Sequence, residues 1–505
     1  MRSITCALGD TRGLRCTAMH DQSLGVKLSK VSVERAAAVF ADLDLGDPRR
    51  TQRVTRIVAS LASNPQASFP KAMGNEADIE GAYRLMNSSR VTMEALNDAH
   101  AEVTARRAVE AKVVLAIHDS TTCEFAHADP EAIGYTNTGK AGFLVHYALV
   151  VSANEKRPLG VVYVEEVVRR KPPRKRSSSK AKKKKHTGFE TVRDPNRESL
   201  RWNRGFAAAH ERLQGAEVIH LADREGDNYH LLAQALSDGC RFVIRARTLE
   251  RRVESTDGES QTLYELVLGA QGVLTREVDL PPRKAAGAPK RAHHPRSARL
   301  ASLAFSAARV ILPRPRIQPV NLPKQLEVNV VRVWESSPPP GEAAIEWVLY
   351  TTEPIETPSD VAAVVDLYRA RWLIEECNKA IKTGCRYEKR QFDSLHALLT
   401  LLALTLPVAC EVLALRAACR RTPTAPATAV LTPTQLQILV VLGSRKLPRN
   451  PTVRDALWAV AALGGHMKTN GEPGWLVLHR GMAELLAYEK GWRAREKVTG
   501  LSISR

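Results

Sequence analysis

The sequence is poor in paired cysteines and in aromatic residues. Its eight cysteines are scattered over 505 residues without a CxxC pair or a regular spacing. Neither a zinc site nor a disulfide framework is therefore indicated, and reduced thiols in a cytoplasmic protein fit best. Aromatic residues make up only 5% of the chain, whereas the apolar fraction of 44% is ordinary for a soluble protein.

Membrane-spanning segments are also lacking. The N-terminus has no apolar signal core, and the most apolar stretch, Ala397 to Cys410, is 14 residues long and contains Pro407. A helix that crosses a bilayer needs about 20 apolar residues. This stretch is therefore predicted to be a buried helix, and no membrane role is expected.

Acidic residues are absent from two strongly basic stretches. Arg169 to Lys185 contains 11 lysines and arginines, and Arg283 to Arg299 contains six more. Because the net charge of the chain is +20, these two stretches hold nearly all of the excess. Such a distribution indicates a polyanionic partner, most simply nucleic acid, although two solubilising loops are the alternative.

The N-terminal part of the chain is expected to be helical and to bind DNA. Residues 1–32 show little apolar periodicity and are expected to be a tail, whereas residues 33–107 look helical. Asp47-Pro48 forms a plausible helix start. The apolar stripe behind it is flanked by arginines, among them Arg49 and Arg50, which makes this region a candidate reader of DNA ends. A plain amphipathic helix explains the same residues almost as well. The stripe consists of Val54, Ile57, Val58 and Leu61.

From residue 108 the pattern becomes α/β. Three predicted strands are followed by a helix, a strand, a helix and a strand, which is the order of a ribonuclease-H-like core. The core is expected to span residues 108–394, with a basic loop at 169–185 and a β-rich insertion at about 248–354, and residues 395–505 are expected to be helical. The predicted strands are 113–117, 143–152, 158–168, 217–222 and 241–246, and the helices are 197–213 and 227–236.

Two acids follow predicted strands of this core. Asp119 comes after the strand 113–117, and Asp223 directly follows the strand 217–222. An acid at the carboxyl end of a strand faces the crevice where open α/β sheets bind ligands. Either acid alone is more simply a turn former or a helix cap.

A third acid lies in the segment Tyr368 to Gly384, which is predicted to be one amphipathic helix. At about 100° per residue, its polar side chains gather on one face and its apolar ones on the other. The polar face holds Tyr368, Arg371, Glu375, Lys379 and Lys382, and the apolar face holds Leu373, Ile374, Cys377, Ala380 and Ile381. A carboxylate among cations suits a site where metal ions and phosphate are held side by side.

Together, Asp119, Asp223 and Glu375 predict a metal site. Converging carboxylates repel one another unless a cation lies between them, and their oxygens favour Mg²⁺ or Mn²⁺. Two such ions about 3.5–4 Å apart catalyse in-line displacement at phosphorus. No His/Cys set with metal-ligand spacing competes, and His118, His146 and His220 are expected to be core or supporting residues.

Six segments resemble the cut-and-paste DDE transposases of bacterial insertion sequences, with the IS-four group, represented by the Tn-five transposase, as the closest. The similarity covers roughly residues 39–388 and extends more loosely to about 486. The last segment carries the group's Tyr-x2-Arg-x3-Glu-x6-Lys signature in full. The segments are LGDPRRTQR, EGAYRLMN, LAIHDSTT, LADREGDNYHLL, EWVLYTTEP and YRARWLIEECNKAIKTG.

The resemblance implies a homodimeric DNA transposase that uses two Mg²⁺ ions, with Mn²⁺ as a substitute. Its partners are double-stranded DNA, namely transposon ends and target DNA, and it works at the nucleoid. Excision proceeds through a DNA hairpin, and the 3′-hydroxyl ends are then joined to target DNA. Asp119, Asp223 and Glu375 become the metal-binding catalytic triad.

The resemblance also implies roles for residues that contact DNA. Tyr368, Arg371 and Lys382 contact the strand near the cleaved phosphate, with Lys379 on the same predicted face. Trp347 stacks on a flipped base, although a core position in a strand is its simpler interpretation. Arg49 and Arg50 align with the end-binding domain, and residues 395–505 align with the dimerisation domain, where Gly464-Gly465 and Trp475 recur.

Two features remain outside the resemblance, and two rival functions remain open. The stretch Arg169 to Lys185 is longer and more basic than the family's usual connection at this place, and the stretch Arg283 to Arg299 within the β-rich insertion is likewise unassigned. The rivals are a non-catalytic DNA-binding inhibitor or repressor derived from a transposase, and a general Mg²⁺-dependent nuclease. Three intact acids argue against the first rival, and end specificity would exclude the second.

Overall fold

The computed structural model describes residues 30–65, 67–171, 194, 197–280, 296–467 and 473–502. Nearly all of the expected tail (1–32) and most of the basic stretches 169–185 and 283–299 lie outside the described residues.

The N-terminal part is helical, as predicted for residues 33–107. Helix α2 begins as expected, because Pro48 occupies its first turn and the Asp47 side chain accepts a hydrogen bond from the Arg49 backbone N–H. The predicted apolar stripe of α2 is buried in full. The helices are α1 (Lys30–Ala38), α2 (Pro48–Ser63), α3 (Phe69–Met73), α4 (Glu76–Met86) and α5 (Met93–Ala111).

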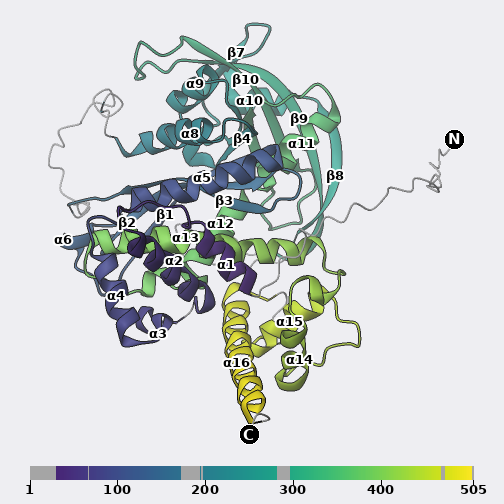
Figure 1. Ribbon diagram of the computed structural model, residues 1–505. Coiled ribbons are helices and arrows are strands. Elements are labelled where there is room, and N and C mark those ends of the chain that lie inside the picture. The colour runs from purple at the N-terminus through teal and green to yellow at the C-terminus, as the bar shows by residue number, and fades with distance from the viewer. Residues whose placement is uncertain are drawn as a thin grey trace.

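A single mixed sheet of eleven strands forms the centre of the molecule (Figure 1). Its first five strands have the order β3-β2-β1-β4-β5, in which β1, β2 and β3 are antiparallel and β1, β4 and β5 are parallel. The predicted order of strands and helices is confirmed. These elements are β1 (Val113–Glu124), β2 (Gly142–Ser152), β3 (Pro158–Val167), α8 (Arg201–Arg212), β4 (Glu217–Ala222), α9 (Tyr229–Ser237) and β5 (Arg241–Arg245).

The expected β-rich insertion extends the same sheet instead of forming a separate layer. Its last strand, β11, pairs antiparallel with β5, and the sheet continues through β10 and β9 to β6 and β7. A short helix, α10, was not predicted. The elements of this region are β6 (Arg252–Glu254), β7 (Ser260–Thr262), α10 (Leu263–Gly269), β8 (Gly272–Leu280), β9 (Arg299–Pro313), β10 (Gln325–Glu335) and β11 (Glu346–Thr351).

Helices cover both faces of the sheet, and the strand alternation decides which side chains meet them. On one face, α8 packs over His118 and His220, next to the apolar side chains of α5 and α9. On the other face, Ile117 and Leu221 belong to the largest core, together with α11 (Pro358–Arg369), α12 (Trp372–Lys379) and the N-terminal helices. Residue 119 lies on the same side of β1 as residue 117, so Asp119 faces α12.

The C-terminal region is helical, as expected. Its first helix, α13 (Leu395–Arg421), is longer than the 14 residues predicted and contains Pro407. Within the described chain, α13 is the helix long and apolar enough to cross a membrane, but 89% of its apolar window is buried in the protein. It is therefore a core helix, as predicted. The predicted reason, that the helix is too short to cross a bilayer, is wrong. The others are α14 (Pro433–Leu442), α15 (Val453–Leu463) and α16 (Trp475–Ser502).

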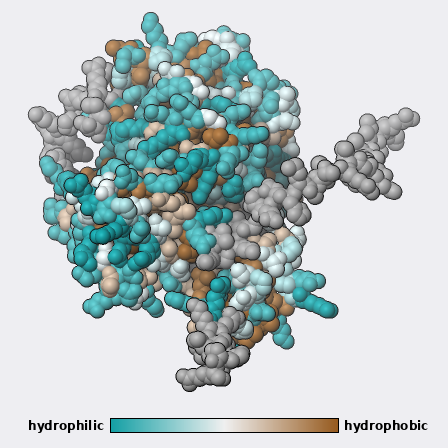
Figure 2. All heavy atoms as spheres, viewed as in Figure 1, coloured by the Kyte–Doolittle hydropathy of each residue, from teal (hydrophilic) through white to brown (hydrophobic). Residues whose placement is uncertain are grey.

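The surface in Figure 2 is mainly hydrophilic, with apolar atoms gathered in its lower part, where Figure 1 places α14 and α15. The end of α14 contributes three strongly exposed apolar side chains. They are Val440, Val441 and Leu442, of which the first two are 67% and 65% exposed.

Candidate active site

Asp119 lies within β1, not after it. The parallel pairing of β1 with β4 ends at His118 and Ala222, whereas its antiparallel pairing with β2 continues to Glu124. The predicted strand end at residue 117 is therefore wrong, because β-branched and polar residues continue the ladder where the apolar run stops. Since His118 and Ala222 are partners, the next residue on each side is an acid: Asp119 lies within β1, and Asp223 directly follows β4.

The Asp119 carboxylate is fixed from the strand and from α12. Its Oδ1 accepts a hydrogen bond of 2.8 Å from the Ser120 backbone N–H, and its Oδ2 lies 3.3 Å from Nδ2 of Asn378. Asn378 is held in turn by the Tyr147 hydroxyl, which donates to its Oδ1 at 2.9 Å. These contacts join β1, β2 and α12 at one point.

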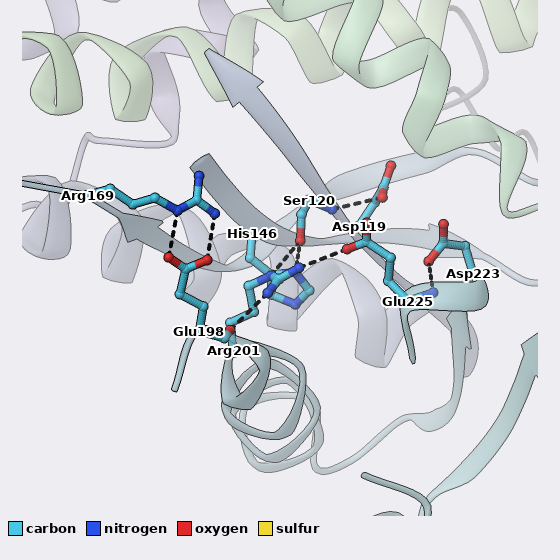
Figure 3. Close-up of polar contacts among 8 residues, drawn as sticks. All are labelled: Asp119, Ser120, His146, Arg169, Glu198, Arg201, Asp223 and Glu225. Atoms are coloured by element: carbon cyan, nitrogen blue, oxygen red, sulfur yellow. Dashed lines mark hydrogen bonds and ion pairs between the residues drawn. The ribbon is translucent and has the colours of Figure 1, made fainter. Parts of the chain in front are cut away.

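Asp223 follows β4 and caps the next turn. Its Oδ1 accepts a 2.8 Å hydrogen bond from the Glu225 backbone N–H, as Figure 3 shows. The simpler interpretation of Asp223 as a cap is thus correct, but it does not exclude a second role. Capping and metal binding are compatible, because a carboxylate has about four acceptor positions.

Glu375 lies in the first turn of α12. The predicted single helix from Tyr368 to Gly384 is wrong: α11 ends at Arg369, α12 runs from Trp372 to Lys379, and a π-helical turn follows. Arg371, between the two helices, brings both terminal nitrogens to 3.4 Å from Glu375 Oε1.

The three acids share one electrostatic environment. Burial raises the pKa of Asp119 to about 7, and the negative charges of Asp223 and Glu375 add to this shift. Burial lowers the pKa of the Arg371 guanidinium, but Tyr368 and the three acids together raise it above its usual value. Neighbouring negative charge thus disfavours the ionisation of Asp119, and a divalent cation bound there would offset this effect.

The donor set fits hard divalent cations. Three carboxylates supply the oxygen ligands that Mg²⁺ and Mn²⁺ prefer. Their carboxylate oxygens do not all lie within 4.8 Å of one another. In the described part of the chain, the side chains whose ligand atoms all lie within 4.8 Å of one another are instead His210, His220 and Cys240.

Two family models match the sequence. A transposase DNA-binding model matches residues 34–91, and a transposase DDE domain model matches residues 112–406, which is more than half of the chain. The chain belongs to the DDE transposases. Its core is therefore ribonuclease-H-like, its substrate is double-stranded DNA, and its reaction is metal-dependent DNA cleavage and strand transfer.

Within the DDE domain, the two aromatic candidates lie together. The ring centroids of Tyr368 and Trp347 are 5.5 Å apart and meet edge to face, and Arg245 lies 5.8 Å from the Trp347 ring. Trp347 is half-buried. Tyr368 is only 5% exposed, so its predicted position on an open polar face is wrong. It lies in α11, on the same buried face as Val361, Val364 and Val365.

The two lysine candidates differ in how far they are engaged. Lys382 donates to the backbone carbonyl of Thr122 and lies 3.4 Å from Glu388, so it ties the π-helical turn to β1. Lys379 is exposed, and its amine lies 5.0 Å from the ring centroid of Trp372, which is itself 52% exposed. Of the two, Lys379 has the more accessible charge for DNA.

The arginines of α2 show a similar division. Arg50 donates to the Leu45 carbonyl at 2.8 Å, whereas the Arg49 side chain is exposed. Two neighbours that flank the same apolar stripe, Arg53 and Arg56, both bind Asp78. Within the matched DNA-binding region, Arg49 is therefore the more accessible of the two predicted contacts.

The sequence did not reveal the importance of Arg201. This buried side chain donates to Ser120 Oγ at 2.9 Å and to Glu225 Oε2 at 2.8 Å, and Ser120 Oγ also lies 3.0 Å from His146 Nδ1 (Figure 3). Arg201 thus links the residue after Asp119 to the turn capped by Asp223. Its position in a predicted helix gave no sign of this role.

Behind this network lies a cluster of buried histidines. His118 and His220 stack on Phe206, with ring centroids 4.3 and 4.6 Å away. Burial lowers the pKa of His146 and of His220 to about 3, so both imidazoles are neutral. Their burial agrees with the expectation that they are core or supporting residues.

The charge environment of Asp119 predicts a cost to stability. Its folded pKa of about 7 exceeds the usual 3.8, so ionisation in the folded state is penalised as the pH rises from about 4 to above 7. Asp119→Asn should therefore stabilise the metal-free protein by about 2–4 kcal/mol at pH 8, since one pKa unit corresponds to about 1.4 kcal/mol.

This gain should vanish near pH 3, where the folded and the unfolded wild-type protein both carry a largely protonated Asp119. Urea unfolding in the presence of EDTA measures both conditions. Equal stability of the two proteins at pH 8 would show that folding does not penalise the ionised Asp119 carboxylate.

Proposed function

We propose that this protein is a cut-and-paste transposase of the IS-four group that excises and inserts its own element. The observation that carries the proposal is the placement of the three acids. Asp119 and Asp223 follow the paired residues His118 and Ala222, and α12, which carries Glu375, contacts Asp119 through Asn378. The full Tyr-x2-Arg-x3-Glu-x6-Lys signature in residues 368–382 supports the assignment to the group.

Asp119, Asp223 and Glu375 hold the divalent ions, which are Mg²⁺ or, as a substitute, Mn²⁺. When bound, a pair of such ions activates the attacking oxygen and stabilises the leaving oxygen of a displacement at phosphorus. Arg371 binds the non-bridging oxygens of the reacting phosphate, because its fork of donors matches their geometry. Asn378 and Ser120 orient Asp119 for this role.

The proposed reaction sequence consists of substitutions at phosphorus alone. Water first attacks at the element's end, the bond from phosphorus to the 3′ oxygen breaks, and a 3′-hydroxyl is released. This hydroxyl attacks the opposite strand and closes a hairpin, losing its proton to solvent while the flanking DNA leaves. A second water opens the hairpin, and the freed 3′-hydroxyl attacks target DNA. One site can serve each step, since the geometry at phosphorus is the same.

Trp347 is proposed to stack on a base turned out of the helix during hairpin formation. Trp347→Ala should slow hairpin formation about 10- to 100-fold while leaving the first nick nearly unchanged, because stacking contributes about 1–3 kcal/mol per base. Trp347→Phe should retain most of the activity. Time courses on denaturing gels separate nicked DNA from hairpin DNA.

Trp334 provides the matched control for this variant. It is half-buried in the neighbouring strand β10, where its neighbour Val333 pairs with Trp347, so the two tryptophans lie on opposite faces of the sheet. Trp334→Ala should affect both steps equally. If Trp347→Ala does the same, base stacking is excluded.

Two copies of the chain are proposed to act on paired transposon ends. Support comes from the resemblance and from the exposed apolar end of α14, formed by Val440, Val441 and Leu442. Lys379 and Arg49 are the most accessible of the proposed DNA contacts, and Arg50 and Lys382 shape the surfaces on which they lie.

The proposal is tested by cleavage of matched DNA ends. Inverted repeats in the genomic DNA that flanks the reading frame supply the substrate, and a scrambled sequence of equal length supplies the control. We expect Mg²⁺-dependent nicks and hairpins at the matched end alone. Binding without cleavage would support a non-catalytic inhibitor, and equal cleavage of both DNAs would support a general nuclease.

A further inference from the structure

Three side chains that differ from the triad in chemistry meet on the α8 face of the sheet. His210 lies in the last turn of α8, His220 in the middle of β4, and Cys240 just before β5. Their ligand atoms all lie within 4.8 Å of one another. His220 pairs with Phe242, so Cys240, two residues before Phe242, lies on the same face of the sheet as His220.

The two histidines carry nitrogens that packing leaves unsatisfied. Nδ1 of His210 and Nε2 of His220 are buried and have no hydrogen-bond partner. His220 itself is fully buried, and Cys240 is only 3% exposed. Because buried polar atoms nearly always have a partner, two such atoms beside a thiol require an explanation.

The second nitrogen of His220 is already held in place. Its Nδ1 lies 3.0 Å from Nε2 of His118, so one imidazole donates a hydrogen bond to the other. When His220 is the donor, its Nε2 lone pair points away from His118, and this is the orphaned atom. Histidines that bind metals typically donate their other N–H to a fixed neighbour in this way.

We propose that His210, His220 and Cys240 form a binding site for a transition-metal ion, best suited to Zn²⁺, separate from the Mg²⁺ site. Two imidazoles and one thiolate are borderline-soft ligands, which zinc prefers, whereas Mg²⁺ prefers oxygen. On binding, the ion replaces the thiol proton of Cys240, which passes to solvent, and it accepts lone pairs from the two orphaned nitrogens.

The site would fasten three elements that surround the catalytic strands. It joins the end of α8 to β4 and β5. Its ligand in β4, His220, lies three residues before Asp223. Through the bond between His220 and His118, it also reaches the residue before Asp119. The ion is thus a clamp for the scaffold of the active site and does not depend on the proposed DNA reaction.

Cobalt and zinc titrations of the full-length protein test the proposal. Protein stripped with a chelator is titrated with Co²⁺ and then with Zn²⁺, in excess Mg²⁺ that occupies the carboxylate site. We expect one Co²⁺ per chain to give sulfur-to-cobalt charge-transfer absorption, which Zn²⁺ then abolishes. Carboxylates alone cannot produce this absorption, so the triad does not interfere.

Three variants assign the signal. Cys240→Ser should abolish the charge-transfer band, and His210→Gln should weaken Co²⁺ binding more than about 100-fold, beyond the 10- to 100-fold typical of outer contacts. Cys385→Ser is the matched control, because Cys385 is equally buried at 3% exposure, and it should retain the band.

Circular dichroism would reveal whether Cys240→Ser folds poorly. In that case His210→Gln still tests the site, because the partly exposed His210 tolerates substitution better than the buried Cys240. Absence of the band from the wild-type protein, or its persistence in both cluster variants, would overturn the proposal and leave the three residues as packing.

Discussion

Asp119→Asn, Asp223→Asn and Glu375→Gln should each reduce Mg²⁺-dependent DNA cleavage by at least about 10³-fold. Each change keeps the shape of the side chain but removes a negative charge. A metal ion contributes several kcal/mol to stabilising the transition state, and each 1.36 kcal/mol corresponds to a factor of ten in rate. Initial rates of nicking on a matched transposon end measure the effect.

Binding of the same DNA end should survive these changes. The triad lies in the DDE domain, whereas residues 34–91 form the matched DNA-binding domain. Electrophoretic mobility shifts in EDTA should therefore give dissociation constants close to that of the wild-type protein. Asp366→Asn is the control, since this acid of α11 instead pairs with Arg276 and Arg369. Cleavage at the wild-type rate by any triad variant would remove that residue from the site.

Arg371→Ala should reduce cleavage about 10²- to 10³-fold, the usual cost of removing one fixed donor at a developing charge. Arg371 is largely buried beside Glu375 and is the one cation whose pKa is raised by all three acids together, among the described residues. Arg371→Lys should recover only part of the activity, because an ammonium group cannot bind phosphate through two parallel hydrogen bonds.

Arg369→Ala is the matched control for this variant. Arg369 lies two residues earlier, is 52% exposed in its side chain and pairs with Asp366 at 3.3 Å. Single-turnover cleavage should distinguish the two variants by at least about tenfold. Equal activity of Arg371→Ala and Arg369→Ala would mean that Arg371 serves the fold alone.

The central strands were predictable because their residues form apolar runs that end at polar residues. Strand β4 was predicted with its observed ends, since the apolar run Val218 to Ala222 stops at Asp223. The end of β1 was missed because His118 to Glu124 is polar and is held by pairing with β2, which depends on residues 142–152. Pairing between distant segments leaves no mark on local periodicity.

The candidate site shows the same division. Regular 100° steps predicted the buried side of the segment that carries Glu375, and Ile374, Cys377, Ala380 and Ile381 are indeed buried. The same steps could not foresee the break after Arg369, which leaves Tyr368 on the buried face of the preceding helix, α11. Likewise, the spacing of residues 210, 220 and 240 fits no ligand pattern along the chain, because the sheet and α8 create that cluster.

The basic stretches 169–185 and 283–299 remain a prediction from charge. Their flanks are engaged within the protein: Arg169 binds Glu198 through two hydrogen bonds, and Arg299 binds Glu335 and Glu342. The remaining cations are still expected to contribute to DNA affinity, with an effect that falls as salt rises.

Iron-directed cleavage of the polypeptide tests most directly whether Asp119, Asp223 and Glu375 bind one group of ions. Fe²⁺ replaces Mg²⁺ at oxygen sites, and with ascorbate and peroxide it cuts the chain beside its ligands. Mass spectrometry should find cuts near residues 119, 223 and 375 together, and all three should disappear with excess Mg²⁺ or in Asp119→Asn. Cuts at only one of these places, or cuts that Mg²⁺ does not suppress, would contradict a shared site.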